Sequence, residues 1–112
     1  MRTTNDQDRV LSEGKAVLDA AASALARLAG ELGAPFVDAA ARILACEGQL
    51  ICTGIGKAGH IARKISATFA STGTLSLFLH PTEAAHGDLG RVRRQDIVLA
   101  FSNSGTSAEL VR

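Results

Sequence analysis

The chain has 112 residues, enough for one small domain, and its 46% hydrophobic and 21% charged residues are typical of a soluble globular protein. A net charge of +1 argues against a nucleic-acid-binding protein, and no apolar run approaches the length of a membrane span. The two cysteines, Cys46 and Cys52, are too few for a disulfide framework or a zinc site. The first ten residues lack the apolar stretch of a signal peptide, which favours a cytoplasmic location.

Two helices are predicted at the start of the chain. Residues 1–8 are polar and are expected to be frayed. From Val10 onward, apolar residues recur in steps of three and four, which predicts one long helix that ends between Gly30 and Pro35. A second helix then continues to about Glu47, before Gly48. We expect residues 1–47 to form a helical leader that packs on a domain formed by residues 48–112.

The pattern changes after Gly48 to short apolar runs that alternate with a helix. The predicted elements are a strand at Gln49–Thr53, a helix at Lys57–Ser71, a strand at Leu75–Leu79, a long connection at His80–Arg94, a strand at Asp96–Phe101 and a helix starting at Ala108. This alternation predicts an α/β fold with a parallel sheet. An all-helical domain is the alternative, which the glycines that bracket each short run disfavour.

Two loops follow predicted strands, where open α/β sheets bind ligands. In the strand order 2-1-3, the loops after the first and third strands face each other. The first, Gly54–His60, matches the dinucleotide pattern G-x-G-x-x-G, but the second strand ends in His80 and Pro81 instead of the acidic residue that holds a ribose. A nucleotide P-loop also fails, because Ala58 follows Lys57. The alternative is that this loop is only a tight turn between strand and helix, with a solvated lysine.

The second loop, Ser102–Ser107, places four hydroxyl residues around Gly105, between a buried strand and a helix. Hydroxyls and free N–H groups at a helix start suit a phosphate group. Because the loop has no cationic side chain and no metal ligands, we expect a small phosphorylated sugar, without a metal or cofactor. The alternative is an N-capping loop with Ser102 or Ser104 as the cap.

A third segment, His80–Gly90, contains two histidines, two acidic residues and two glycines. No regular spacing of metal ligands appears in it. A histidine in a loop is commonly just solvated, but this concentration of polar residues makes His86 a candidate for the site.

Three segments together resemble the sugar isomerase (SIS) domain of the D-arabinose-5-phosphate isomerase family: TGIGKAGHIARKISATFASTGT, HPTEAAHGDLG and SNSGTSAEL. The resemblance runs from about Gln49 to the end of the chain. It implies a flavodoxin-like parallel sheet, of which the chain holds an incomplete part whose strand order begins 2-1-3. It also implies a tetramer with sites shared between subunits.

The resemblance assigns roles to individual residues. Lys57, His86 and Glu109 fall on catalytic positions, and the substrate and phosphate positions are Gly56, Ser102, Asn103, Ser104, Gly105, Thr106 and Ser107. Two positions depart from the family: Ala58 replaces an expected serine, and Thr106 stands where glutamate is frequent. A further catalytic glutamate and histidine, two strands and a pair of regulatory domains would lie beyond Arg112.

The function that the resemblance implies is interconversion of D-ribulose 5-phosphate and D-arabinose 5-phosphate through an enediol, for synthesis of 3-deoxy-D-manno-octulosonate and lipopolysaccharide. Residues 1–112 alone are expected to be inactive. The alternatives are a non-catalytic phosphosugar-binding SIS module and a hexulose-phosphate isomerase.

Overall fold

The computed structural model describes residues 3–106 and 108–111, without the side chains of Asp88, Glu109 and Val111. The chain divides into two compact units, Met1–Ala39 and Ala40–Arg112. Helix α1 (Thr4–Glu31) belongs to the first unit, and helix α2 (Ala34–Leu44) contains the boundary between them. The sheet and every candidate site residue belong to the second unit.

Helix α1 starts earlier than the sequence suggested. Its N-cap is Thr3, whose hydroxyl accepts a hydrogen bond from the Asp6 N–H at 3.3 Å, while the Asp6 carboxylate accepts from the Thr3 N–H at 3.4 Å. This reciprocal pair satisfies backbone donors that the first turn leaves without a partner. The expectation that residues 1–8 are frayed is therefore wrong from Thr3 onward. None of the helices in the described part of the chain has the length and apolar character needed to cross a membrane.

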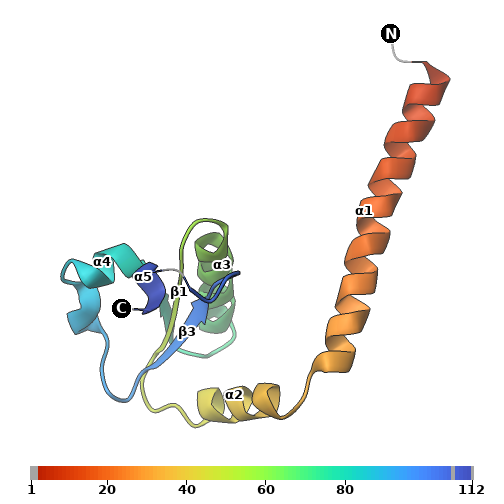
Figure 1. Ribbon diagram of the computed structural model, residues 1–112. Helices are drawn as coiled ribbons and strands as arrows, with labels where there is room; N and C mark the ends of the chain where they lie inside the picture. Colours follow the sequence, from red (N-terminus) through yellow and green to blue (C-terminus); the bar gives the residue numbers. More distant parts are fainter. Residues whose placement is uncertain (1–2, 107, 112) are drawn as a thin grey trace. The chain divides into compact units, whose positions relative to one another are not determined.

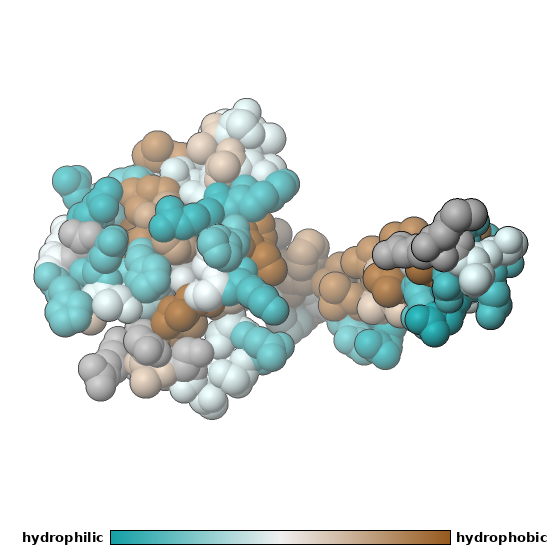
Figure 2. Space-filling model, turned by 90° about the horizontal axis from the view of Figure 1, so that it is seen from above, coloured by the Kyte–Doolittle hydropathy of each residue, from teal (hydrophilic) through white to brown (hydrophobic). Residues whose placement is uncertain are grey.

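One side of α1 is apolar from Val10 onward. Leucines recur every seven residues on this side, at Leu11, Leu18 and Leu25, and the C-cap residue Leu32 continues the spacing; each of the four is at least half exposed. In Figure 2, hydrophobic surface follows one side of α1 and hydrophilic surface follows the other. A seven-residue repeat is the spacing at which helices pack along one another as coiled coils.

The second unit contains a three-stranded parallel sheet in the order β2-β1-β3, which confirms the order expected from the sequence. The strands are β1 (Leu50–Gly54), β2 (Ser76–Phe78) and β3 (Ile97–Phe101). Helix α3 connects β1 to β2 and has the predicted bounds, Lys57–Ser71. In the register of β1 and β3, Leu50 pairs with Ile97 and Gly54 with Phe101. The two strands therefore end at the same level.

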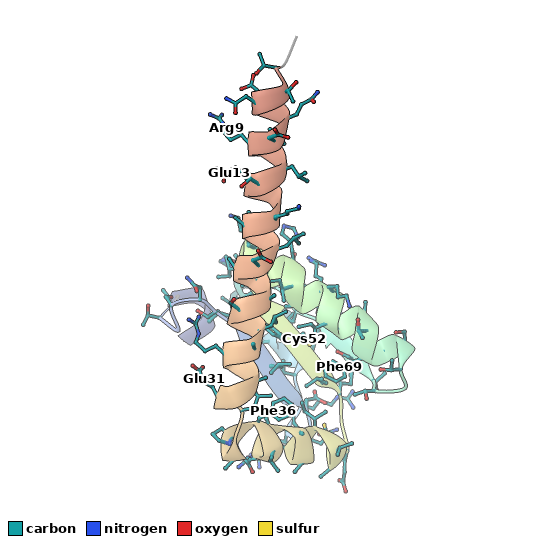
Figure 3. All side chains as sticks on the ribbon, turned by 90° about the vertical axis from the view of Figure 1, so that its right-hand side faces the viewer. Arg9, Glu13, Glu31, Phe36, Cys52 and Phe69 are labelled. Carbon is teal, nitrogen blue, oxygen red and sulfur yellow. The ribbon has the colours of Figure 1, made fainter. Side chains whose placement is uncertain are left out.

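The core lies between the sheet and α3. Side chains alternate along β1, so that Leu50 and Cys52 pack with the buried Ala62 of α3. Phe69 of α3 is among the partly buried residues around this cluster (Figure 3). Burial raises the pKa of the Cys52 thiol, against the opposing effect of hydrogen bonds with Ser76 and Ser66. Cys52 is thus a structural side chain of the core.

The other face of the sheet carries two short helices that were not predicted from the sequence, together with the predicted helix that starts at Ala108. The connection after β2 contains helix α4 (Pro81–Ala85) and a 3-10 helix, η1 (Asp88–Arg91). Figure 1 shows α4 and α5 (Ala108–Val111) on the side of the strands opposite α3. Two local features favour the start of α4: Pro81 suits a first helical turn, and the His80 ring accepts a hydrogen bond from the Thr82 N–H at 3.1 Å.

Asp96 holds the start of β3 against the start of β1. Its carboxylate accepts hydrogen bonds from the Gln49 N–H at 2.8 Å and the Arg93 N–H at 2.7 Å. These bonds, and the charge of Arg93 to a smaller extent, lower the pKa of Asp96 from its usual range. A side chain at Gly48 would collide with the Asp96 carboxylate, so this corner requires glycine.

The lowered pKa of Asp96 predicts acid-dependent stability. Because the ionised form is favoured in the folded chain, its contribution is present above the ordinary aspartate pKa and is lost as the pH falls through the folded-state pKa. Asp96→Asn should lower the midpoint temperature of thermal unfolding at neutral pH. The midpoint of this variant should also decrease less than that of the unchanged chain as the pH is lowered. Thermal scans from pH 7 to pH 3 measure both, with Asp19→Asn on the exposed surface of α1 as the control. Equal acid profiles for Asp96→Asn and the unchanged chain would contradict this role.

Candidate phosphosugar site at the carboxyl ends of β1 and β3

A hollow of about 400 Å³ lies where the chain leaves β1 and β3. Its lining comes from the turn after β1, the end of β3 with the loop after it, and α5: Ile55, Lys57, Ala58, Phe101, Ser102, Asn103, Ser104 and Leu110. The pairing of Gly54 with Phe101 explains this meeting, because the two loops leave the sheet side by side. The predicted opposition of the two loops is confirmed.

The turn after β1 depends on close backbone contact. A Cβ atom at Gly59 would lie 2.7 Å from the Gly54 carbonyl oxygen, too close for any side chain. Gly56 caps α3 with a φ of 61°, a left-handed value that favours glycine. The turn therefore brings the first residue of α3, Lys57, directly to the mouth of the hollow.

The loop after β3 is closed by its own hydroxyls. The Ser102 hydroxyl accepts from the Gly105 N–H at 2.9 Å, and the Ser104 hydroxyl accepts from the Thr106 N–H at 3.2 Å. Gly105 has a φ of 71°, which this tight turn requires. A serine that accepts a hydrogen bond still has its own O–H to donate. Ser102 and Ser104 can therefore shape the loop and donate to an anionic ligand in the hollow.

Charge in the hollow is positive. Lys57 is the one ionisable side chain among the described residues that line it. Its ammonium group, together with the hydroxyls of Ser102 and Ser104 and the amide of Asn103, favours an anion with several oxygen atoms. The hollow carries no group of three or more His, Cys, Asp or Glu within the described residues that could bind a metal ion.

Some predicted site residues lie elsewhere. Gly56 lines a neighbouring hollow, and Thr106 is exposed in the loop without being part of the lining. His86 is the exposed C-cap of α4 and does not line the hollow after β1 and β3. Ser107 and the side chain of Glu109 lie outside the described part of the chain, although the backbone of Glu109 is in α5. The roles of these residues stay predictions.

The apolar wall of the hollow was missed by sequence reasoning. Ile55, Phe101 and Leu110 come from three separate segments, and nothing in their local pattern distinguishes them from core residues. Ala58 also lines the hollow, at the position where a serine was expected. An alanine there leaves one hydroxyl donor fewer for a ligand.

A parallel sheet with a hollow between the loops that follow two neighbouring strands places the second unit among the open α/β domains, the class in which ligand sites lie at the carboxyl ends of the strands. The family model of the SIS domain matches residues 43–112. The chain belongs to the SIS domain family.

Two curated relatives have the same activity in their names. The arabinose 5-phosphate isomerase KdsD of Salmonella typhi is 52% identical over 97 residues, which cover 87% of this chain and 30% of the relative. The arabinose 5-phosphate isomerase GutQ of Salmonella typhi is 48% identical over 103 residues, covering 92% of this chain and 32% of the relative. The chain thus spans about a third of the length of these relatives.

A solved structure extends the similarity to nearly the whole chain. The protein c3406 of Escherichia coli CFT073, in complex with arabinose 5-phosphate, is 40% identical and superposes with a TM-score of 0.70. The match covers 97% of this chain and 56% of that chain.

Proposed function

We propose that the protein containing this chain is a D-arabinose-5-phosphate isomerase, which interconverts D-ribulose 5-phosphate and D-arabinose 5-phosphate. The observation that carries this proposal is the meeting of Lys57 with the Ser102–Ser104 segment in one hollow. The 52% identity to KdsD supports the choice of substrate. In this proposal the product serves 3-deoxy-D-manno-octulosonate and lipopolysaccharide synthesis, and residues 48–112 are the first part of the SIS domain behind the helical leader, residues 1–47.

The two loops divide the work in this proposal. The Ser102–Ser107 loop holds the phosphate by hydroxyl and backbone donors, which fixes the sugar beside α3. Lys57 donates to the sugar oxygens, where negative charge develops in the transition state. Glu109 is the proton-transferring base, and His86 assists from the α4 segment.

The reaction moves one hydrogen between two neighbouring carbons. A base takes a proton from C1 of the ketose while the C2 oxygen gains a proton, which gives the 1,2-enediol. Return of a proton to C2 and loss of the proton on the C1 oxygen then give the aldose. Lys57 suits this chemistry because an ammonium group near both oxygens stabilises either enediolate.

The test is an assay of the full-length protein with D-ribulose 5-phosphate, followed by NMR of both sugars. We expect equilibration of the two phosphates, no turnover of unphosphorylated D-ribulose, and no turnover by residues 1–112 alone. Binding without conversion would instead support a non-catalytic phosphosugar module. Conversion of a hexulose 6-phosphate in preference to the pentulose would support the other isomerase.

We also propose that the protein is a homo-oligomer in which the apolar side of α1 contacts a second copy. The seven-residue leucine repeat supports this proposal, because two helices that carry such a repeat pack along each other as a coiled coil.

Carboxylates placed within this stripe should separate the copies. The double substitution Leu18→Glu and Leu25→Glu is expected to reduce the mass in sedimentation velocity, because charged groups would be buried between helices. Ala20→Glu, on the opposite side of α1, is the matched control and should leave the mass unchanged. A monomeric mass for the unsubstituted protein would contradict the proposal.

A further inference from the structure

A second hollow, of about 170 Å³, lies on the other side of the turn after β1, towards β2. Its lining consists of Gly54, Gly56, Gly59, His60, Arg63, Phe78 and His80. It shares no lining residue with the hollow that contains Lys57. Its volume is several times the roughly 30 Å³ that one water molecule occupies in the liquid.

Three basic side chains from two segments converge on this second hollow. His60 and Arg63 stand one turn apart on α3 and therefore share a side of the helix. His80 comes from the connection between β2 and α4. Its Nδ1 accepts from the Thr82 N–H, so the neutral ring carries its own proton on Nε2 and can donate from there.

Phe78 orients two of these groups. The Arg63 guanidinium lies 4.0 Å from the centre of the Phe78 ring, and the His80 ring meets Phe78 edge-on with 6.4 Å between ring centres. A guanidinium that stacks on a ring keeps the N–H groups at its edge available for an oxyanion. Phe78 is itself half-buried beside α3, so it provides a firm support.

The rest of the lining also favours an anion. None of the described residues that form it is acidic, so the charge of Arg63 is not neutralised within the hollow. Gly54, Gly56 and Gly59 have no side chains, which lets a ligand approach the backbone. An arginine fork with two imidazole donors matches the several oxygen atoms of a phosphate or carboxylate.

We propose that this hollow is a second oxyanion site, in which Arg63, His60 and His80 bind a phosphate or carboxylate group separately from the ligand beside Lys57. The proposal does not depend on the isomerase activity. Because Gly56 lines the second hollow and the next residue, Lys57, lines the first, an anion bound here contacts the turn that positions the lysine.

Histidine ring signals provide a direct test. In the intact protein with labelled histidine, inorganic phosphate and acetate are titrated separately while the ring resonances of His60 and His80 are followed by NMR. We expect saturable shifts of both rings with at least one of the two anions, and the anion that acts defines the ligand class. Ser104→Ala, which alters the first hollow, should leave these shifts unchanged.

Two neighbouring residues on α3 give matched variants. Arg63→Gln should weaken the binding that the rings report by about tenfold or more, the scale of losing one charge-assisted hydrogen bond. Lys64→Gln removes the same charge one position away and should change the affinity less than twofold. Arg63→Lys keeps the charge but loses the forked guanidinium, so its affinity for the anion should lie between those of the other two variants.

Two outcomes would overturn the proposal. One is that neither anion produces saturable shifts of the histidine rings; the other is that Arg63→Gln and Lys64→Gln lose the same amount of affinity. Circular dichroism shows whether each variant is folded.

Discussion

Lys57→Ala in the full-length protein is expected to lower turnover of D-ribulose 5-phosphate by at least about a hundredfold, the scale of losing one oxyanion donor. Lys57 is the first residue of α3 and the one ionisable side chain among the described residues of the hollow. The phosphate would be held by the loop after β3, so binding of a phosphate analogue should largely survive. Steady-state kinetics and calorimetric titration of the analogue separate the two effects.

Lys64→Ala is the matched control for this prediction. Lys64 lies on the same helix, is exposed, and donates to the Thr68 hydroxyl at 3.0 Å. Lys64→Ala should keep turnover within about twofold of the unsubstituted protein, since Lys64 does not line the hollow. If Lys57→Ala abolished binding while turnover per bound substrate stayed normal, Lys57 would be a phosphate ligand instead of a donor to the sugar oxygens.

Glu109→Gln in the full-length protein is expected to stop exchange of the C2 proton of D-arabinose 5-phosphate with solvent deuterium, while the substrate still binds. Glu109 is the second residue of α5 and follows the hydroxyl loop by two residues. A loop that anchors the phosphate would also hold this position at a fixed distance from the sugar carbons. Such proximity contributes several kcal/mol, roughly 7–11 kcal/mol in the best-oriented model reactions. Proton NMR in deuterium oxide measures the exchange.

The competing interpretation of Glu109 is a carboxylate that only favours the start of a helix. In that case Glu109→Gln would cost about 0.3–1 kcal/mol of stability and leave the chemistry intact. Glu83→Gln, at an exposed carboxylate in the first turn of α4, is the control for such an effect. Normal exchange in Glu109→Gln would remove this residue from the mechanism and assign the base to another carboxylate of the full-length protein.

The sequence by itself determined the elements whose pattern is local. The bounds of α3 follow from a helical run between Gly56 and Gly73, and the parallel sheet follows from apolar strands separated by connections long enough to cross over. The prediction that Ser102–Ser107 binds a phosphate also came from residues adjacent in the sequence, namely hydroxyl residues around Gly105. These features depend on residues a few positions apart, whose preferences can be read directly.

Helix α4 lay beyond such local reasoning. The long connection that starts at His80 contains Pro81, Gly87 and Gly90, so its pattern resembled a loop. In the structure, Pro81 is buried and lines a hollow together with Ile51 and Leu79, on the face of the sheet opposite α3. A helix of five residues cannot be stable alone, so packing against the sheet decides whether it forms.

Only the tertiary structure decided which side chains share a site. The turn after β1 has two sides: Lys57 lines the hollow towards β3, while His60 and Arg63 line the hollow towards β2 with His80. The sequence contains all four residues but not their separation into two groups. That separation arises because β1 lies between the other strands, so that its exit turn meets a different loop on each side.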